Sequence, residues 1–482
     1  MTDENSIPSP SLIEPQSRGG EIAGGGLSFQ EEVLIAKVPY WLADEGFTSF
    51  IQESIGDAEA KFFVPGHTFQ KEFIEVKNHS LSGTEFWQEI QRFYQVDRSN
   101  PNVYRRFYLV ATGIVQKLNP LISALDRIRS TGDFHLDSSA IWNSSYDGYV
   151  EIVQRLEKDT AIANFIFDRV CIELDWNSVK ADGYGLFESS LVQNFVDYED
   201  LSARRLKEMY EKIKTILRNH INKPIARAQI ERCLESRQLS EKSVSHKAIK
   251  LLTANSVAVD ENETAIVLRW ADFFGSGRNY PRAEEWQNRL LKDLQQAKKW
   301  ILTERATRRI HVMGSRRLSA SVALGTVFSA VSGFSLEMDY RSGDIWKTDA
   351  HADRDTPRYN LSEYCQVNQS EVLAVSIGIP RSIASDVDNN LQRLGLADAS
   401  VLHFHGKEAI ISQQQANLVS SMLKERIRDK VISCNARVIH LFVAIPAPLA
   451  IFLGHRLNAM CVIQCYEWNN SFEYVSTCLL ET

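Results

Sequence analysis

The sequence predicts an α/β protein with more than one domain, and three observations lead to this. Residues 47–113 follow the order strand, strand, helix, strand, which is typical of a compact α/β core. A second α/β region follows a long helix expected at 283–302 and runs to the end of the chain. Within it, IHVMGSRRLSASVALG (310–325) and IHLFVAIPAPLAIFLG (439–454) form a gapless repeat with an offset of 129 residues.

The elements of the first region can be justified in order. Ser28 and Glu31 have the spacing of a capping box that opens a helix. Residues 47–63 and 70–78 alternate as strands, an amphipathic helix is expected at 84–94, and RRFYLVATG (105–113) is a strongly apolar strand. The chain is then mostly helical to about residue 252. We therefore expect a flexible arm (1–26), an α/β domain with a helical extension (27–225), a helical connector (226–252) and a second domain (253–482).

Composition limits the possible functions. The chain has 482 residues, 44% of them apolar, and a net charge of −7, so no global positive field draws it to nucleic acid. Any such contact needs a local basic surface, for which the candidates are Lys71, Lys77, Arg92, Arg105 and Arg106. Seven cysteines without a CxxC pair predict neither a disulfide framework nor a zinc site. With no signal-peptide pattern and no membrane-length apolar run, we expect a cytoplasmic protein.

The stretch KEFIEVKNHS (71–80) places an acid and a base inside an apolar run. Because side chains alternate on a strand, Ile74 and Val76 point one way, and Glu75 and Lys77 point the other. Two interpretations follow. The pair is a solvated salt bridge at a sheet edge, or it is half of an active site.

The repeat predicts two similar lobes that face each other across a crevice. In each copy an apolar strand leads directly into a helix, whose N-terminal N–H groups and partial positive charge favour phosphate. Arg316 and Arg317 lie at this turn in the first copy, where two cations oppose the helix dipole unless an anion binds there. The alternative is that both copies are only hydrophobic strand–helix units that pack a core.

These residues resemble a known family. HVMGSRRLSASVALG, SGDIWK and HLFVAIPAPLAIFLGHRLNA are similar to the SAVED domain, a fusion of two CARF-like Rossmann-type units, over roughly residues 255–482. The resemblance implies a receptor for cyclic oligonucleotides in bacterial anti-phage signalling (CBASS). The segments SFQ, QESIGDAE and FIEVK resemble, less specifically, the restriction-endonuclease-like domain of PD-(D/E)xK type that is fused to SAVED in some of these effectors.

The nuclease resemblance implies catalytic roles for Asp57, Glu75 and Lys77. Two carboxylates on neighbouring strands could hold Mg²⁺ or Mn²⁺, and we assign Asp57 and Glu75 as the metal ligands. Lys77 would orient or deprotonate the attacking water, and burial together with the metal is expected to lower its pKa. Gln30 and Glu53 are weaker candidates that could assist. A second Glu-x-Lys string, Glu59-Ala60-Lys61, lies just upstream. We prefer Glu75 and Lys77 because the apolar residues around them make an interior strand and because Asp57 precedes them at a suitable distance.

A cyclic trinucleotide needs cations and helix N-termini for its phosphates and aromatic faces for its bases. The candidate ligand-binding residues are Gly314, Ser315, Arg316, Arg317, Trp346, Lys347, Lys407, Pro446, Ala447 and Pro448. For Trp346, a position in the hydrophobic core is an equally good interpretation. Ser376 is a further candidate to line the crevice.

The resemblance implies a double-stranded DNA endonuclease that a cyclic trinucleotide activates. The messenger would come from a CD-NTase, a cGAS-like nucleotidyltransferase. We expect a monomer without the ligand and a homo-oligomer with it. A ligand-sensing scaffold with an inactive nuclease-like domain, and a nuclease directed at RNA, are the alternatives.

Overall fold

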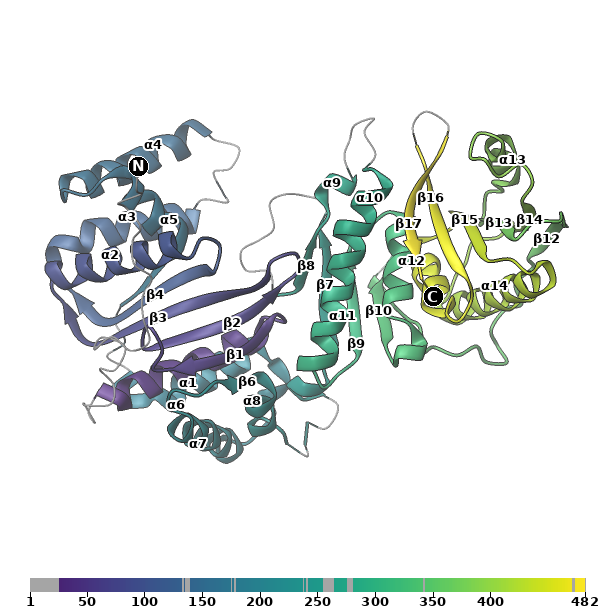
Figure 1. Cartoon of the computed structure of the whole chain (residues 1–482). Helices are drawn as coiled ribbons and strands as arrows, with labels where there is room; N and C mark the ends of the chain where they lie inside the picture. Colours follow the sequence, from purple (N-terminus) through teal and green to yellow (C-terminus); the bar gives the residue numbers. More distant parts are fainter. Residues whose placement is uncertain are drawn as a thin grey trace. The chain divides into compact units, whose positions relative to one another are not determined.

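In the computed structural model the chain forms two compact units (Figure 1). The structure describes residues 26–481 except 132–133, 135–138, 175, 177–178, 237, 240–241, 255–263, 275–280, 341–342 and 470–472. Unit 1 comprises Met1–Phe63 and Phe69–Ser245, and unit 2 comprises Val64–Thr68 and His246–Thr482. The division after Ser245 falls inside the segment expected as a connector. All but the last residue of the expected arm (1–26) lies outside the described residues. No helix in the described part of the chain is long and apolar enough to cross a membrane.

Unit 1 is built on one sheet with the strand order β5-β4-β3-β2-β1-β6. Its strands are β1 (Phe47–Gln52), β2 (Ala58–Val64), β3 (Thr68–Leu81), β4 (Tyr104–Ile114), β5 (Val170–Glu173) and β6 (Ile225–Ala226). β3, β4 and β5 are parallel neighbours, and β1 is antiparallel to both β2 and β6. The chain crosses from β3 to β4 through helix α2 (Gly83–Ser99), so α2 lies directly on the sheet beside β3.

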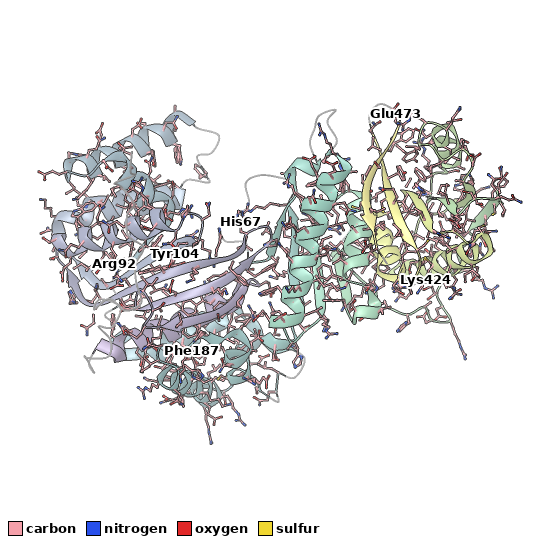
Figure 2. The ribbon with its side chains drawn as sticks, viewed as in Figure 1. His67, Arg92, Tyr104, Phe187, Lys424 and Glu473 are labelled. Carbon is pink, nitrogen blue, oxygen red and sulfur yellow. The ribbon has the colours of Figure 1, made fainter. Side chains whose placement is uncertain are left out.

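Helices cover both faces of this sheet. The remaining helices of unit 1 are α1 (Gly26–Ala43), α3 (Asn119–Thr131), α4 (Ser139–Arg155), α5 (Thr160–Arg169), α6 (Val179–Asn194), α7 (Ala203–Asn219) and α8 (Arg227–Cys233). α1, α6 and α7 pack on the face that carries Ile74 and Val76. α2, α3 and α5 pack on the face that carries Phe73. Figure 2 shows Phe187 of α6 on the first side and Arg92 of α2 on the second.

The start of α2 is fixed by a capping box. Glu85 N donates to Ser82 Oγ (3.2 Å), and Ser82 N donates to Glu85 Oε2 (3.0 Å). Two N–H groups that a helix start leaves without partners are thereby satisfied. The helix begins at Gly83, one residue before the expected start. Because α2 starts immediately after β3, its first turns are held next to the charged residues of that strand.

Unit 2 contains two sheets, and the predicted α/β class is confirmed. The first has the order β11-β10-β9-β7-β8, with strands β7 (Ile249–Ala254), β8 (Ile266–Arg269), β9 (Arg309–Gly314), β10 (Ser335–Asp339) and β11 (Ile345–Lys347). The second has the order β12-β14-β13-β15-β16-β17, with strands β12 (Ser362–Gln366), β13 (Val372–Gly378), β14 (Ser400–His405), β15 (Val438–Ala444), β16 (Val462–Trp468) and β17 (Tyr474–Leu480). Strands within each sheet are parallel except β11, β12 and β17.

The helices of unit 2 connect these strands. They are α9 (Ala271–Phe274), α10 (Ala283–Glu285), α11 (Lys292–Glu304), α12 (Leu318–Val327), α13 (Ala384–Leu391), α14 (Gln413–Cys434) and α15 (Ala447–Arg456). A π-helical segment, Trp286–Leu291, joins α10 to α11, so the long helix expected at 283–302 contains a local widening of the turn.

The sequence repeat corresponds to β9 with α12 and to β15 with α15, and the two helices pack against each other. A Cβ atom at Gly325 would overlap the carbonyl oxygen of Ile451, and one at Gly454 would overlap that of Val322. Val322 and Ile451 are themselves 129 residues apart, as are the two glycines. The contact is therefore reciprocal, like the interface of a two-fold symmetric dimer, and only glycine permits the close approach.

We expect Gly325→Ala and Gly454→Ala each to destabilise the protein by about 1–3 kcal/mol, because the added methyl meets rigid backbone atoms. This exceeds the gain of about 1 kcal/mol from the better helix propensity of alanine. Urea denaturation measures the change. Gly148→Ala in α4 is the matched control, since a Cβ there meets nothing within 4 Å, and that variant should be at least as stable as the wild type. Wild-type stability of both lobe variants would contradict the close packing.

His455 joins α15 to the other lobe, since its Nε2 is 3.0 Å from the carbonyl oxygen of Phe334. Burial lowers the pKa of His455 to about 4. In the unfolded chain the pKa is about 6.5, so only the unfolded state takes up a proton as the pH falls from about 6.5 to about 4. Protonation of His455 in the unfolded chain should therefore lower the free energy of unfolding by roughly 3 kcal/mol as the pH falls from about 6.5 to about 4. Above about pH 6.5 it should have no effect.

The measurement compares the free energy of unfolding at pH 7 and pH 5 for the wild type and for His455→Gln. The variant should lose less stability between these two values than the wild type. His351→Gln, at an exposed position, should follow the wild-type curve. Identical pH profiles for all three proteins would contradict a buried neutral His455.

Candidate active site and ligand-binding region

The turn between β1 and β2 carries Asp57 and is tightly closed. Glu53 has a φ of 55° and donates its N–H to Asp57 O (2.8 Å), while Ser54 N donates to Gly56 O (3.0 Å). A Cβ at Gly56 would lie 2.5 Å from the ring of Phe73 on β3. The glycine thus lets the turn approach β3 closely enough for Asp57 to reach that strand.

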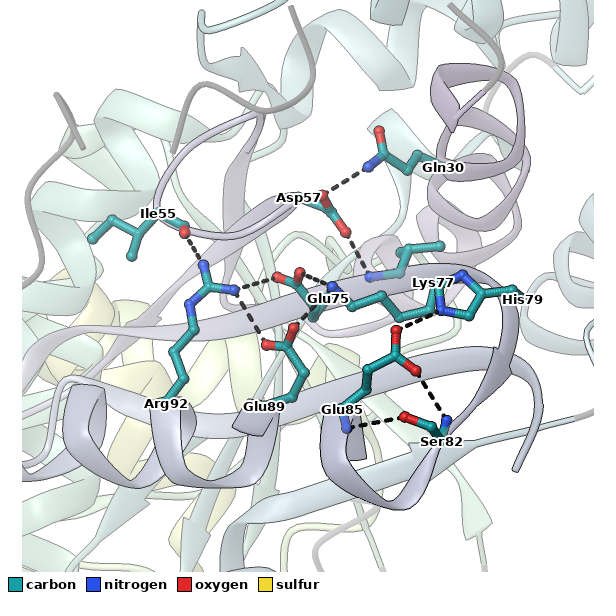
Figure 3. A network of polar contacts seen from close by, with 11 residues as sticks. Gln30, Ile55, Asp57, Glu75, Lys77, His79, Ser82, Glu85, Glu89 and Arg92 are labelled. Carbon is teal, nitrogen blue, oxygen red and sulfur yellow. Dashed lines mark hydrogen bonds and ion pairs between the residues drawn. The ribbon is translucent and has the colours of Figure 1, made fainter. Parts of the chain in front are cut away.

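Asp57 is held by two donors from different elements (Figure 3). Its Oδ1 accepts from Gln30 Nε2 of α1 (2.7 Å), and its Oδ2 accepts from the backbone N–H of Val76 on β3 (2.6 Å). Burial raises the pKa of Asp57 well above its usual value, and the nearby charge of Glu75 raises it further. A second charge at this position is therefore costly until a cation compensates it.

Glu75 and Lys77 form one ionic cluster with two residues of α2. Lys77 Nζ lies 2.9 Å from Glu75 Oε1 and 2.8 Å from Glu89 Oε1. Arg92 Nη1 lies 3.1 Å from Glu75 Oε2 and 3.3 Å from Glu89 Oε2, and Arg92 also donates to the carbonyl of Ile55. Glu75 is only 5% exposed, and β3 lies inside the sheet, so a solvated salt bridge at a sheet edge does not describe this pair.

The lowering of the Lys77 pKa was expected from burial together with a metal ion. Burial lowers the pKa of Lys77, but the charges of Glu75 and Glu89 outweigh burial, so the residues of the chain alone shift it upward. The prediction had not included Glu89. One feature of the sequence could have indicated the role of Glu89. Glu89 and Arg92 are one helical turn apart, and each lies next to a buried residue of the helix, Ile90 or Phe93. Both charged residues are therefore expected near the sheet.

The second Glu-x-Lys string does not form a comparable pair. Glu59 Oε1 lies 3.2 Å from Lys71 Nζ and accepts from the hydroxyl of Tyr104 (2.7 Å). Lys61 Nζ instead lies 3.8 Å from the centroid of the Phe69 ring. Glu53, the other weak candidate, lies close enough to Asp57 for its charge to contribute to the raised pKa.

The five cations expected to form a basic surface are half-buried, and each contacts another side chain of unit 1. Lys71 contacts Glu59, Lys77 and Arg92 contact Glu75 and Glu89, Arg105 contacts Asp44 and Glu72, and Arg106 contacts Cys171. Ion pairs with these acids neutralise most of the expected positive charge. Lys71, Lys77, Arg92 and Arg105 therefore add little net positive charge to the basic surface that was expected.

The donor set at Asp57 and Glu75 fits a hard divalent cation. Two carboxylates lie close enough for one to raise the pKa of the other, which is the charge excess that such a cation relieves. The buried Oε1 of Gln30 has no hydrogen-bond partner among the described residues and offers a third oxygen. Across the described part of the chain, no cluster of three or more His, Cys, Asp or Glu side chains is arranged to hold a metal ion.

A hollow of about 1190 Å³ adjoins this cluster. Glu75, Lys77, Glu89 and Arg92 line one part of it, and the rest follows α2 and the segments that contain Lys117 and Lys158. The acid–base cluster is thus accessible from an open concave surface.

In unit 2, the turn from β9 to α12 carries four candidate residues, Gly314 to Arg317. Gly314 has a φ of 81°, and a Cβ there would overlap Thr253 O, so glycine is required. Arg316 Nη1 donates to Gly314 O (3.0 Å) and Met313 O (3.3 Å), and its buried Nε has no partner among the described residues. Burial lowers the pKa of Arg316 to about 10. Arg316 is thus a desolvated cation whose recorded partners are carbonyls.

The N-terminus of α12 is already occupied by an acid. Ser319 N donates to Glu467 Oε1 (2.6 Å) from β16, and burial raises the pKa of Glu467. Arg317 donates to Phe273 O, and its charge acts on Glu467. The expectation of free amides at this helix start is therefore wrong at Ser319.

The second copy differs from the first. Pro446 is the N-cap of α15, and Pro448 lies in the first turn. Among the described residues, the N–H groups of Ala447 and Leu449 have no hydrogen-bond partner. No hydrogen bond between described residues joins this turn to Gly314–Arg317. The open helix start predicted from the repeat is thus present at α15.

The other ligand candidates have diverse surroundings. Trp346 is 3% exposed and stacks on Tyr340 with ring centroids 3.9 Å apart, so it packs in the core. Lys347 N donates to Gln413 Oε1 (2.9 Å), and its ammonium is 3.7 Å from Glu337. Lys407 is exposed after β14.

Ser376 is 1% exposed and lies 2.6 Å from His403 Nδ1, and His403 Nε2 lies 3.1 Å from Asp388. A serine, a histidine and an aspartate in a row have the composition of a hydrolase triad. The serine oxygen is buried inside β13, however, so it cannot reach a substrate. We read this chain of contacts as structural.

The C-terminal part of the chain matches a known protein family. Residues 293–480 match the SAVED domain, described as "SMODS-associated and fused to various effectors sensor domain". The C-terminal part of the chain is thus similar to a class of sensor domain that is fused to various effectors.

The relatives extend over the whole chain. CD-NTase-associated protein 4 of Moraxella osloensis is 29% identical over 97% of this chain and 99% of its own length, and that of an Acinetobacter species is 28% identical with the same coverage. The Cap4 SAVED/CARF-domain receptor of Acinetobacter baumannii, solved with the cyclic trinucleotide 2′3′3′-cAAA, matches 96% of this chain and all of its own with a TM-score of 0.83 at 26% identity. Over almost its whole length the chain is thus similar to CD-NTase-associated protein 4 and to the Cap4 SAVED/CARF-domain receptors.

Proposed function

We propose that this chain is a metal-dependent endonuclease for double-stranded DNA, activated by a cyclic trinucleotide, and that it acts in CBASS anti-phage defence. One observation carries the nuclease assignment. Gln30 and the N–H of Val76 hold Asp57 beside β3, and Glu75 and Lys77 of the same strand line a large hollow. An inactive scaffold would have no need to keep these costly buried charges together.

When bound at Asp57 and Glu75, Mg²⁺ or Mn²⁺ would acidify the attacking water and neutralise charge on the phosphate. The residues of the chain prepare this site. Gln30 and the N–H of Val76 fix both oxygens of Asp57. Arg92 holds Glu75 and the Ile55 carbonyl together, which keeps the β1–β2 turn beside β3.

Lys77 is better suited to donate hydrogen bonds as an ammonium than to accept a proton as a base. Its upward-shifted pKa keeps the side chain an ammonium, because Glu75 and Glu89 both stabilise the charge. An ammonium beside the scissile phosphate stabilises the negative charge that develops in the transition state. We therefore assign Lys77 to charge stabilisation and orientation of the water.

We expect Glu75→Gln and Lys77→Met each to lower DNA cleavage on the order of 10²-fold or more, with unchanged affinity for the activating ligand. Plasmid cleavage with Mg²⁺ and saturating 3′3′3′-cAAA measures the effect. Lys61→Met, at the lysine of the other Glu-x-Lys string, is the control and should cut normally. Full cleavage by either site variant, or wild-type cleavage in excess EDTA, would contradict the assignment.

The sensor assignment rests on Arg316 and on the open N-terminus of α15. A desolvated guanidinium and two amides without partners are the groups that bind phosphates. Two solved structures of the A. baumannii receptor contain cyclic trinucleotides, which supports a ligand of this class. A CD-NTase would supply it, as the name of the relatives indicates. The ligand would assemble monomers so that nuclease domains act on both strands together.

We expect Arg316→Gln to weaken binding of 3′3′3′-cAAA by roughly tenfold or more, because a charge-assisted phosphate contact contributes about 1.5–3 kcal/mol. Isothermal titration measures the affinity, and sedimentation velocity should show less ligand-induced assembly in the variant. Arg437→Gln, at an exposed ion pair, is the control and should bind as the wild type does. Wild-type affinity of the Arg316→Gln variant for the ligand would show that Arg316 is not part of the binding site. A wild-type monomer that cuts DNA in the presence of ligand would eliminate activation by assembly.

A further inference from the structure

A DNA-cutting enzyme with a net charge of −7 must supply positive charge locally, and the five cations first expected to do so are held by partners inside unit 1. The hollow beside the acid–base cluster offers another source. It continues from Glu75 and Lys77 along α2 for a volume of about 1190 Å³, which makes it large enough for several nucleotides.

The α2 side of this hollow is a polar stripe. Thr84, Gln88, Gln91 and Gln95 all line it, at spacings of four, three and four residues. Such spacing places them on one side of the helix, away from the buried Phe86, Ile90 and Phe93. All four are exposed. Amide side chains in a row donate and accept hydrogen bonds without adding charge that would repel an anion.

Two lysines from other segments complete the wall. Lys117 belongs to the short 3₁₀ turn before α3, and Lys158 precedes α5. Neither has an acidic partner among the described residues, and Lys158 Nζ is held 5.2 Å from the centroid of the Trp87 ring. Glu157 is the one acid recorded along the hollow outside the cluster at Lys77.

The charges along the hollow therefore favour an anion. Lys77 and Arg92 are balanced by Glu75 and Glu89, so they add little. Lys117 and Lys158 against Glu157 leave an excess of positive charge on the open part. An extended polyanion that runs along the hollow from the acid–base cluster would contact the glutamine amides of α2 on one side and Lys117 and Lys158 on the other.

We propose that this hollow, which we name the α2 groove (Thr84, Trp87, Gln88, Gln91, Gln95, Lys117 and Lys158), binds the sugar–phosphate backbone of the substrate next to the cleaved bond. The assignment rests on the proposed nuclease function and adds the substrate-contact surface to it. Phosphates pair with the two lysines, and the glutamine amides bond to phosphate and sugar oxygens. Contacts of this kind hold a strand in register without reading its sequence.

The test measures binding separately from cleavage. Fluorescence anisotropy follows a labelled DNA duplex with the full chain in EDTA and 3′3′3′-cAAA, over a series of salt concentrations. Lys117→Gln and Lys158→Gln should each weaken binding on the order of tenfold at low salt and reduce the slope of log K against log salt by about one. Gln91→Glu, which changes charge but not shape, should weaken binding as well.

Lys223→Gln is the matched control, since Lys223 is an exposed lysine of unit 1 that does not line the groove. It should bind DNA as the wild type does. Circular dichroism checks that the variants, all at solvent-facing positions, keep the fold. The proposal for the α2 groove would be overturned if both lysine variants kept the wild-type affinity and the wild-type salt slope. It would also be overturned if the wild type bound no DNA.

The outcomes for the two proposals are distinguishable. If the wild type binds DNA but never cuts it, and the groove variants lose binding, the groove stands and the nuclease assignment fails. If all variants bind and cut as the wild type does, the groove fails and the nuclease assignment stands. A matched RNA oligonucleotide that binds more tightly, with the same losses in the variants, would keep the groove and change the substrate.

Discussion

The register of β3 is the constraint on which unit 1 depends. This strand lies inside the sheet with helices on both faces, so each of its side chains has only one acceptable side. Ile74 and Val76 enter the apolar cluster under α1, and Glu75 and Lys77 face α2. A slip of one residue would place both charges in that apolar cluster and both apolar side chains against Glu89 and Arg92. Core packing therefore enforces the position of the acid–base pair.

A buried ionic cluster contributes less to stability than apolar residues of the same volume would. Here Asp57, Glu75 and Glu89 lie near only two cations, Lys77 and Arg92. Burial, together with the charge of Glu75, raises the pKa of Asp57. A protein selected only for stability would not need this arrangement. Buried charge clusters of this kind are common at reactive sites, and this is why the cluster supports the proposed nuclease assignment.

Local patterns allowed the strands, the helix after β3 and the repeated strand–helix unit to be predicted, because each depends on periodicity within a short segment. The errors all involve distant partners. The pKa of Lys77 depends on Glu89 of another element, and the start of α12 depends on Glu467, which is 148 residues from Ser319. Arg105 was expected at the surface because nothing in its own segment reveals Asp44 and Glu72. Sequence spacing predicts which face a side chain takes, but it does not predict which charges from elsewhere meet it there.

The two strand–helix copies of unit 2 meet through glycines at matching positions, yet their helix starts now differ. The start of α12 holds a carboxylate of the protein itself, whereas that of α15 is open. A symmetric pair of separate chains could not make this distinction, because any acid added to one would appear in both. Joining the copies in one polypeptide removed that restriction. The backbone framework kept its pseudo-two-fold symmetry, whereas the chemistry of the two helix starts no longer has it.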